Sequence, residues 1–113
     1  MNGPTAVPEI TAIELKERLD AGDVPVLVDV RESFELEIAD LPDYGQRHIP
    51  KGEFPQRFGE LDPSAEVVIY CRSGARSAWA ASILLQNGYE RVLNLQGGVL
   101  GWRAEVDPSL SAY

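Results

Sequence analysis

Apolar residues recur along the chain in short continuous runs, which are separated by polar stretches with helical spacing. Several runs are rich in Val, Ile and Leu and lack alternating polar positions, which is typical of strands buried on both faces of a parallel sheet. Two shorter segments, residues 9–10 and 46–49, predict an edge strand and a brief strand that ends before a proline. The expected strands are residues 9–10, 24–30, 46–49, 67–70 and 92–95.

The stretches between the expected strands carry helix signals. Thr11 is a good N-cap residue, and Glu14 three positions later completes the capping-box pattern of the first helix. Gly22 and Gly88 stand where two of the helices should stop, as glycines at helix C-termini do. The expected helices are residues 12–21, 33–39, 54–61, 77–87 and 99–105.

Because strands and helices alternate, the sequence predicts an α/β fold: a small three-layer sandwich with a mainly parallel sheet of four or five strands and helices on both faces. The length of 113 residues suffices for one domain. We expect a flexible N-terminal arm at residues 1–8, the folded domain at residues 9–105 and a C-terminal tail at residues 106–113. Ligands of such folds bind at the carboxyl ends of the strands.

Composition argues against several function classes. A formal net charge of −8 disfavours binding to nucleic-acid phosphates, which requires a basic surface. No apolar run approaches the ~20 residues of a membrane-spanning helix, and the N-terminus shows no secretory signal. One cysteine and one histidine allow neither an internal disulfide nor a Cys/His metal cluster, so we expect a cytoplasmic protein without a metal or a membrane partner.

The sole cysteine, Cys71, directly follows the expected strand at residues 67–70 and precedes a tight polar loop and a helix. This order directs loop amides and the positive end of a helix dipole at the sulfur, and nearby arginines add positive charge. We therefore expect a thiolate nucleophile, because such surroundings lower the pKa of a thiol from ~8.5 to roughly 3.5–7.5. The alternative for a lone cysteine is a small buried apolar side chain. The candidate loop residues are Arg72, Ser73, Gly74, Ala75, Arg76 and Ser77.

Two arginines stand in this loop and have different expected roles. Arg72 is expected to point to solvent and to attract anionic reactants. Arg76 either contributes to the anion site or holds the loop through a carboxylate such as Asp29. Asp29 and Arg31 follow the strand before, and we expect them to brace the rim of the site as an ion pair rather than to take part in the chemistry.

Serines and glycines complete the candidate site. Ser73 and Ser77 can donate hydrogen bonds to the sulfur or cap the following helix, and capping is the favoured interpretation for Ser77. Gly74 indicates a backbone angle or a close approach that other residues disfavour. Gly97 and Gly98 follow the last strand, and we expect them to let the chain pass close to the loop.

Four segments together match one known family: Asp-Val-Arg-Glu at residues 29–32, Tyr-Cys-Arg-Ser-Gly-Ala-Arg-Ser at residues 70–77, Leu-Gln-Gly-Gly at residues 95–98 and Gly-Trp at residues 101–102. Over most of its length the chain resembles a single-domain rhodanese, a sulfurtransferase. The resemblance implies the rhodanese-like fold and a persulfide on the loop cysteine. The persulfide would be loaded from thiosulfate or a protein persulfide and passed to a nucleophilic acceptor, with no other cofactor.

Residues 49–54 and 106–113 more narrowly resemble the rhodanese domain at the C-terminus of adenylyltransferase-sulfurtransferases. This implies a ubiquitin-like sulfur-carrier protein, or an adenylyltransferase, as partner. The chain departs from the family's His-Ile-Pro-Gly-Ala turn, because Lys51 follows the tripeptide at residues 48–50. We expect His48 to be structural and to lie in the strand after that turn.

Two other functions stay open. A non-catalytic binding module would use the fold to dock a partner, although relatives of that kind commonly lack the cysteine. Phosphatases and arsenate reductases of related architecture have five residues between cysteine and arginine, which widens the loop for a tetrahedral oxyanion. Four residues separate Cys71 from Arg76 here, which favours sulfur transfer.

Overall fold

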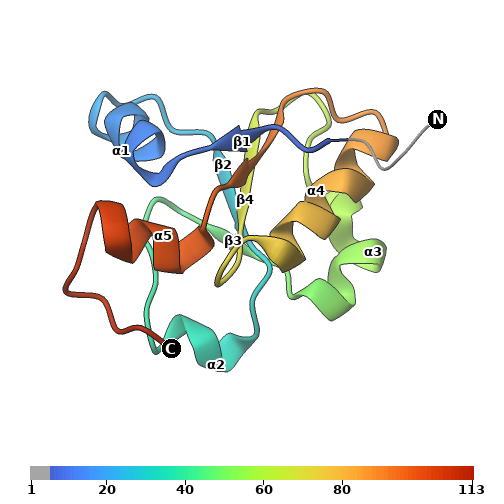
Figure 1. Ribbon diagram of the computed structural model, residues 1–113. Coiled ribbons are helices and arrows are strands. Elements are labelled where there is room, and N and C mark those ends of the chain that lie inside the picture. Colours follow the sequence, from blue (N-terminus) through green and yellow to red (C-terminus); the bar gives the residue numbers. More distant parts are fainter. Residues whose placement is uncertain (1–5) are drawn as a thin grey trace.

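The computed structural model describes residues 6–113 and consists of a parallel sheet between two layers of helices (Figure 1). The strands lie in the order β1-β5-β4-β2-β3, and every neighbouring pair runs parallel. The predicted α/β sandwich with a mainly parallel sheet is confirmed. The strands are β1 (Glu9–Ile10), β2 (Val26–Asp29), β3 (Arg47–His48), β4 (Val67–Tyr70) and β5 (Val92–Leu95).

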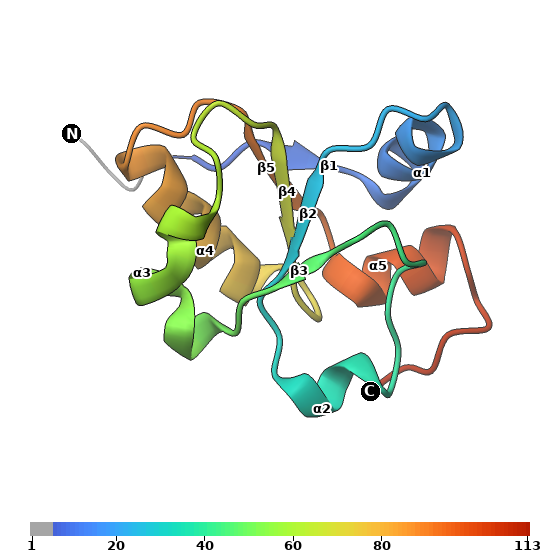
Figure 2. The same cartoon turned by 180° about the vertical axis from the view of Figure 1, so that it is seen from behind.

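Helices α1 and α5 cover one face of the sheet, α3 and α4 cover the other, and α2 lies beyond the end of β2 (Figure 2). Thr11 and Glu14 form the predicted capping box at the start of α1. None of the helices within residues 6–113 has the length and apolar content required to cross a bilayer. The helices are α1 (Ala12–Asp20), α2 (Ser33–Leu36), α3 (Phe54–Arg57), α4 (Ala75–Gln86) and α5 (Gly98–Glu105), with 3-10 turns η1 (Lys51–Glu53) and η2 (Phe58–Glu60).

Two helices are shorter than the sequence predicts. Helix α2 ends after about one turn, and the guanidinium of Arg31 donates to the carbonyls of Glu35 and Ala39 at and beyond its end. The single helix expected at residues 54–61 is wrong: it divides into α3 and the tighter turn η2 around Gly59. Glycine is a poor helix former, which favours the break at that point.

Strand β4 is buried on both faces and positions the candidate loop. Its residues alternate between the core under α3 and α4, to which Cys71 also belongs, and the core under α1 and α5. Tyr70, the last residue of β4, lies opposite Asp29, the last residue of β2. Because both strands end there, the segment after Asp29 and the loop after Cys71 meet at the same edge of the sheet.

The C-terminal residues pack against the α1 and α5 layer. Half-buried Val106, Leu110 and Tyr113 contact that core, and Arg103 Nε donates to the Leu110 carbonyl at 2.7 Å. The chain end therefore comes close to α2 in both views (Figures 1 and 2). The predicted arm at residues 1–8 lies mostly outside the described residues.

Candidate active site

Cys71 lies at the carboxyl end of β4 with its sulfur facing a set of hydrogen-bond donors. The amide of Gly74 donates to Sγ at 3.1 Å, and the neighbouring amides of Ser73 and Ser77 help to lower the pKa of the thiol. The Ser77 hydroxyl lies 3.4 Å from the same atom. The cysteine is only 1% exposed, so the loop covers it and the α3/α4 core packs beneath it. The site thus combines the expected ring of donors with the burial that the apolar alternative expects.

The N-terminus of α5 explains why the loop amides face the sulfur. The amide of Val99 donates to the Cys71 carbonyl at 2.9 Å, and the amide of Leu100 donates to the Arg72 carbonyl at 3.0 Å. In a trans peptide the N–H points away from the C=O. With the Arg72 carbonyl held on α5, the N–H of Ser73 is therefore directed to the opposite side, toward Sγ.

Gly74 turns the loop into helix α4. It is the N-cap of that helix and has φ +110°, in the left-handed region that favours glycine. The predicted capping role of Ser77 is wrong: Ser77 is the third residue of α4 and is buried beside Cys71. The cap position falls at Gly74 because the loop reverses direction there, and Ser77 is left to face the sulfur.

Asn94 is a site residue that the sequence analysis missed. Its Nδ2 donates to the Gly74 carbonyl at 3.1 Å, and its Oδ1 accepts from the Ser77 hydroxyl at 2.5 Å. Strand β5 thereby holds both the loop and the hydroxyl that faces Cys71. The sequence did hold a sign of this role: Asn94 is the one polar residue of the otherwise apolar strand at residues 92–95. A buried polar side chain requires hydrogen-bond partners.

Arg76 pairs with Glu35, another residue that the sequence analysis missed. Its Nη1 and Nη2 donate to the two carboxylate oxygens at 2.7 and 2.8 Å, so α4 is joined to α2. The expected pairing with Asp29 is wrong, because Asp29 is occupied by Arg31. The contacts of Arg76 therefore support a structural role. Its charge is neutralised by the nearly buried carboxylate of Glu35.

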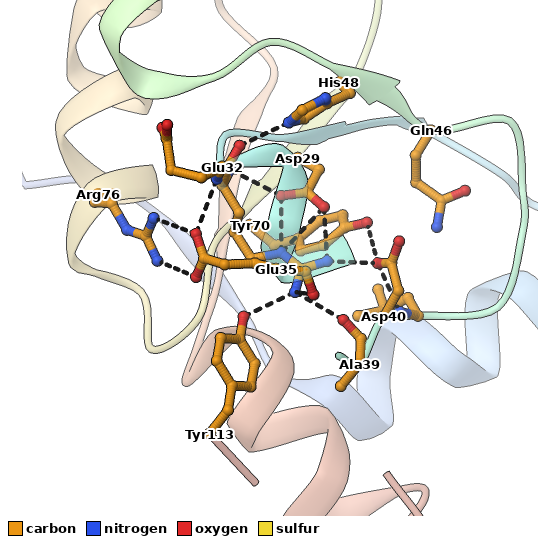
Figure 3. A network of polar contacts seen from close by, with 12 residues as sticks. Asp29, Glu32, Glu35, Ala39, Asp40, Gln46, His48, Tyr70, Arg76 and Tyr113 are labelled. Atoms are coloured by element: carbon orange, nitrogen blue, oxygen red, sulfur yellow. Dashed lines mark hydrogen bonds and ion pairs between the residues drawn. The ribbon is translucent and has the colours of Figure 1, made fainter. Parts of the chain in front are cut away.

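Arg31 is the centre of a buried polar network, and its partners Asp29, Asp40, Ala39 and Tyr113 are labelled in Figure 3. Its guanidinium is fully buried and pairs with Asp29 at 2.8 Å and with Asp40 at 3.1 Å. It also donates to the Ala39 carbonyl at 2.7 Å and to the Tyr113 hydroxyl at 2.8 Å. The predicted ion pair of Asp29 and Arg31 is present, and it braces the segment between β2 and α2.

Arg72 does not extend freely into solvent as expected. Its guanidinium lies 5.2 Å from the centre of the Tyr113 ring, and the residue is half-buried. The C-terminal segment therefore reaches the loop residue next to Cys71. Contacts across this sequence separation carry no local signal, so the sequence alone could not reveal them.

His48 lies on β3, as expected from the altered turn. Its Nε2 is 2.6 Å from the Arg31 carbonyl, so this nitrogen carries the hydrogen and donates. The imidazole thus supports the backbone of the same segment that holds Arg31. Its contact supports the structural role expected for it.

The fold and the loop can be compared with known proteins. The family model described as rhodanese-like domain matches residues 11–105. The chain belongs to the rhodanese-like domain family. A protein named "Sulfurtransferase" from Allochromatium vinosum is 44% identical over 96 residues, which cover 85% of this chain and 88% of that protein. The resemblance stated from the sequence is confirmed.

Two further comparisons bear on the architecture and on the narrower resemblance. The crystal structure of a rhodanese-related protein from Thermoplasma volcanium superimposes with a TM-score of 0.78 at 30% identity and covers 89% of this chain and 95% of that one. The "Probable adenylyltransferase/sulfurtransferase MoeZ" of Mycobacterium tuberculosis is 33% identical over 92% of this rhodanese-like chain. The match spans only 26% of that longer protein.

The hydrogen bonds of the rhodanese-like loop make Cys71 easier to ionise than an ordinary cysteine. Burial raises the pKa of the Cys71 thiol, but the hydrogen bonds from Ser77, Gly74 and Ser73 outweigh burial and leave the pKa below its ordinary value. The thiolate in turn helps to raise the pKa of Arg76, after the larger effect of Glu35. Within residues 6–113 no group of three or more His, Cys, Asp or Glu side chains is placed to hold a metal ion.

We expect Ser77→Ala to raise the pKa of Cys71, because it removes one donor from the sulfur. The Ser77 hydroxyl has one hydrogen and lies within reach of Sγ, Asn94 Oδ1 and the Gly74 carbonyl, and a charged sulfur draws that hydrogen more strongly than a thiol does. The rate of reaction with iodoacetamide is measured against pH, and the midpoint of its rise should lie at a higher pH in the variant than in the wild type. Ser73→Ala is the matched control, since Ser73 donates through its amide and its side chain is exposed. An unchanged pH profile in Ser77→Ala would rule out this donor.

Glu35 should govern part of the acid stability. Hydrogen bonds from Arg76, opposed by burial, lower the pKa of Glu35 from 4.5 to about 2. A carboxylate whose pKa is lower in the folded state stabilises the fold above the unfolded-state pKa, and this contribution is lost as the pH falls through the folded-state pKa. Glu35→Gln should thus be less stable than the wild type by about 1–3 kcal/mol at neutral pH.

The same comparison at low pH separates this effect from simple loss of packing. The difference in the free energy of unfolding between wild type and Glu35→Gln should shrink as the pH falls from about 4.5 to about 2. Urea titrations at several pH values measure it. Glu60→Gln removes an exposed carboxylate that also pairs with arginine, and it should change stability much less. A difference independent of pH would contradict the assigned ion pair.

Proposed function

We propose that this chain is a sulfurtransferase that carries sulfane sulfur as a persulfide on Cys71. The observation that carries the proposal is the cysteine sulfur held among the amides of Ser73, Gly74 and Ser77 and the Ser77 hydroxyl. Such donors stabilise negative charge on the attacking thiolate and, after transfer, on the persulfide. The family membership and the relative named sulfurtransferase support the same reaction.

Loading of Cys71 is a displacement at sulfur. The thiolate attacks the outer sulfur of thiosulfate, a new S–S bond forms, and the bond to the sulfonate sulfur breaks. Sulfite leaves with that electron pair, and the negative charge of the thiolate ends on the outer sulfur of the persulfide. A protein persulfide serves in the same way, with a thiolate as leaving group. Burial of Cys71 beneath the loop suits a donor that presents a single terminal sulfur atom.

Unloading reverses the roles of the two sulfurs. A nucleophilic acceptor attacks the outer sulfur, the S–S bond breaks, and its electron pair returns to Cys71 as the thiolate that the donors favour. We propose a ubiquitin-like sulfur-carrier protein as a second kind of acceptor, with the roles of nucleophile and electrophile exchanged. Once its C-terminal carboxylate is activated as an acyl adenylate, the outer sulfur of the persulfide attacks the carbonyl carbon and AMP leaves. A thiol then attacks Sγ of Cys71, the thiocarboxylate leaves with the electron pair of the S–S bond, and a second thiol releases Cys71 from the mixed disulfide. The similarity to one quarter of an adenylyltransferase/sulfurtransferase supports this choice, together with the resemblance of residues 106–113 to the C-terminal rhodanese domain of such enzymes.

Intact-mass measurement tests the proposed reaction. Wild-type protein incubated with thiosulfate should gain the mass of one sulfur atom, and cyanide should remove it as thiocyanate. The variant Cys71→Ser should gain nothing under the same conditions. If wild type and Cys71→Ser form thiocyanate at equal rates, or if no adduct forms with thiosulfate or a protein persulfide, the chain is a binding module instead. Cys71-dependent hydrolysis of an aryl phosphate or arsenate reduction would replace sulfur transfer as the proposed function.

A further inference from the structure

Tyr113 lies between two arginines that belong to different parts of the site. Its hydroxyl accepts a hydrogen bond from Nη1 of Arg31 at 2.8 Å (Figure 3). The face of its ring is 5.2 Å from the guanidinium of Arg72, the residue after Cys71. A single side chain thus connects the buried brace with the rim of the loop.

The anchor of Tyr113 is rigid. Arg31 is fully buried and bonded to Asp29, Asp40 and Ala39, so the donor that holds the hydroxyl cannot move without breaking this network. Leu110, three residues earlier, packs on the core and accepts from Arg103. The tyrosine ring is therefore a fixed surface, and a guanidinium that stacks on it loses freedom to swing into solvent.

Arg72 is the loop arginine whose charge is available to a reactant. The charge of Arg76 is matched by Glu35, whereas among residues 6–113 Arg72 forms no ion pair. The chain as a whole carries a net charge of −8, which repels anions. The attraction of an anionic reactant toward Cys71 therefore depends on where the guanidinium of Arg72 is held.

We propose that Tyr113 is a positioning residue: its ring holds the guanidinium of Arg72 beside the entrance to Cys71 and so favours anionic over neutral reactants. The inference rests on the proposed function only in assuming that reactants reach Cys71. Tyr113 touches no reacting atom and acts through Arg72. The hydroxyl fixes the ring, and the ring fixes the cation.

Two variants separate the ring from its anchor. Tyr113→Leu removes the aromatic face, whereas Tyr113→Phe keeps it and removes the hydrogen bond to Arg31. In nitrogen-15 NMR spectra the Nε–H signal of Arg72 should show a ring-current shift and restricted motion in the wild type. Both should be weakened in Tyr113→Phe, which keeps the ring but loses its anchor, and should disappear in Tyr113→Leu. Tyr44→Leu is the control, because Tyr44 is a partly exposed tyrosine outside the site.

Alkylation of Cys71 measures the consequence without any sulfur transfer. The ratio of the rates with iodoacetate, an anion, and iodoacetamide, its neutral analogue, should fall by about two- to fivefold in Tyr113→Leu. It should fall to the same level in Arg72→Ala, and the double variant should show no further loss. Tyr44→Leu should retain the wild-type ratio, and Tyr113→Phe, with the ring but not its anchor, should lie between the wild type and Tyr113→Leu. Urea unfolding shows that each variant is folded.

Several results would overturn the proposal. These are an unchanged ratio in Tyr113→Leu, equal losses in Tyr113→Phe and Tyr113→Leu, an Arg72 signal that is insensitive to Tyr113, or a wild-type Cys71 that resists both reagents. A different result concerns the proposed function alone. If thiosulfate loads no sulfur onto the wild type while the alkylation ratios change as expected, the positioning role stands and sulfur transfer from thiosulfate does not.

Discussion

Replacing Gly98 by alanine is expected to lower the free energy of unfolding by about 2–5 kcal/mol and to disturb the donors around Cys71. Gly98 has φ +57°, and a Cβ there would lie 2.4 Å from the Cys71 carbonyl oxygen and 2.7 Å from the carbonyl carbon and oxygen of Arg72. These are backbone atoms, so the loop itself would have to move. The predicted close approach of this glycine to the loop is confirmed, and it is the closest that any described glycine makes.

The consequence for the sulfur follows from the same contact. The carbonyls that Gly98 touches are those held by the first amides of α5, and they direct the loop amides toward Sγ. If the loop is pushed away, the Cys71 sulfur loses donors, and the pKa of its thiol should rise. Urea unfolding and the pH dependence of alkylation by iodoacetamide measure the two effects.

Other glycines provide controls that separate strain from contact. Gly88 has φ +87°, and a Cβ added there would have no neighbouring atom within 4 Å, so Gly88→Ala introduces backbone strain alone. Gly59 has neither a positive φ nor a close neighbour, so Gly59→Ala introduces neither. Gly98→Ala should be clearly less stable than Gly88→Ala, and only Gly98→Ala should change the thiol. Equal effects at Gly98 and Gly88 would show that the contact with the loop is unimportant.

The parts of the site that could be predicted from sequence are those that depend on residues close together in the chain. The strand before Cys71, the tight loop and the following helix depend on local preferences, and burial on both faces of β4 explains its unbroken apolar pattern. The ion pair of Asp29 and Arg31 joins residues two positions apart, and the positive φ of Gly74 belongs to the loop itself. The expected surroundings of Cys71 follow from this local order.

The missed contacts join residues that are distant in sequence. Glu35 is 41 positions from Arg76, and Tyr113 is 82 positions from Arg31. Several carboxylates could have paired with Arg76, and Asp29 was the more obvious choice because it follows a neighbouring strand. The arrangement is decided by Arg31, whose guanidinium occupies Asp29 completely and leaves Glu35, on the adjacent helix turn, for the loop.

The replacement Arg31→Met should cost about 3–5 kcal/mol of stability, because breaking a buried ion pair leaves a buried charge without its partner. Asp29 is about 1% exposed, and in the variant it would keep only the hydrogen bond from the backbone amide of residue 31. The Ala39 carbonyl and the Tyr113 hydroxyl would lose their donor as well. Methionine keeps a flexible unbranched stem in place of the aliphatic part of arginine, so the loss reports the guanidinium and the space that it fills.

Arg57→Met is the matched control for burial. Arg57 also binds two carboxylates, Glu53 and Glu60, but the side chains of that cluster are 36–57% exposed, so its loss should cost much less stability than the loss of Arg31. Combining Arg31→Met with Asp29→Asn should recover part of the stability, since the second change removes the unpaired charge. Urea unfolding compares all three variants. Similar losses at Arg31 and Arg57, or no recovery in the double variant, would mean that the network around Arg31 is not what holds the rim of the site.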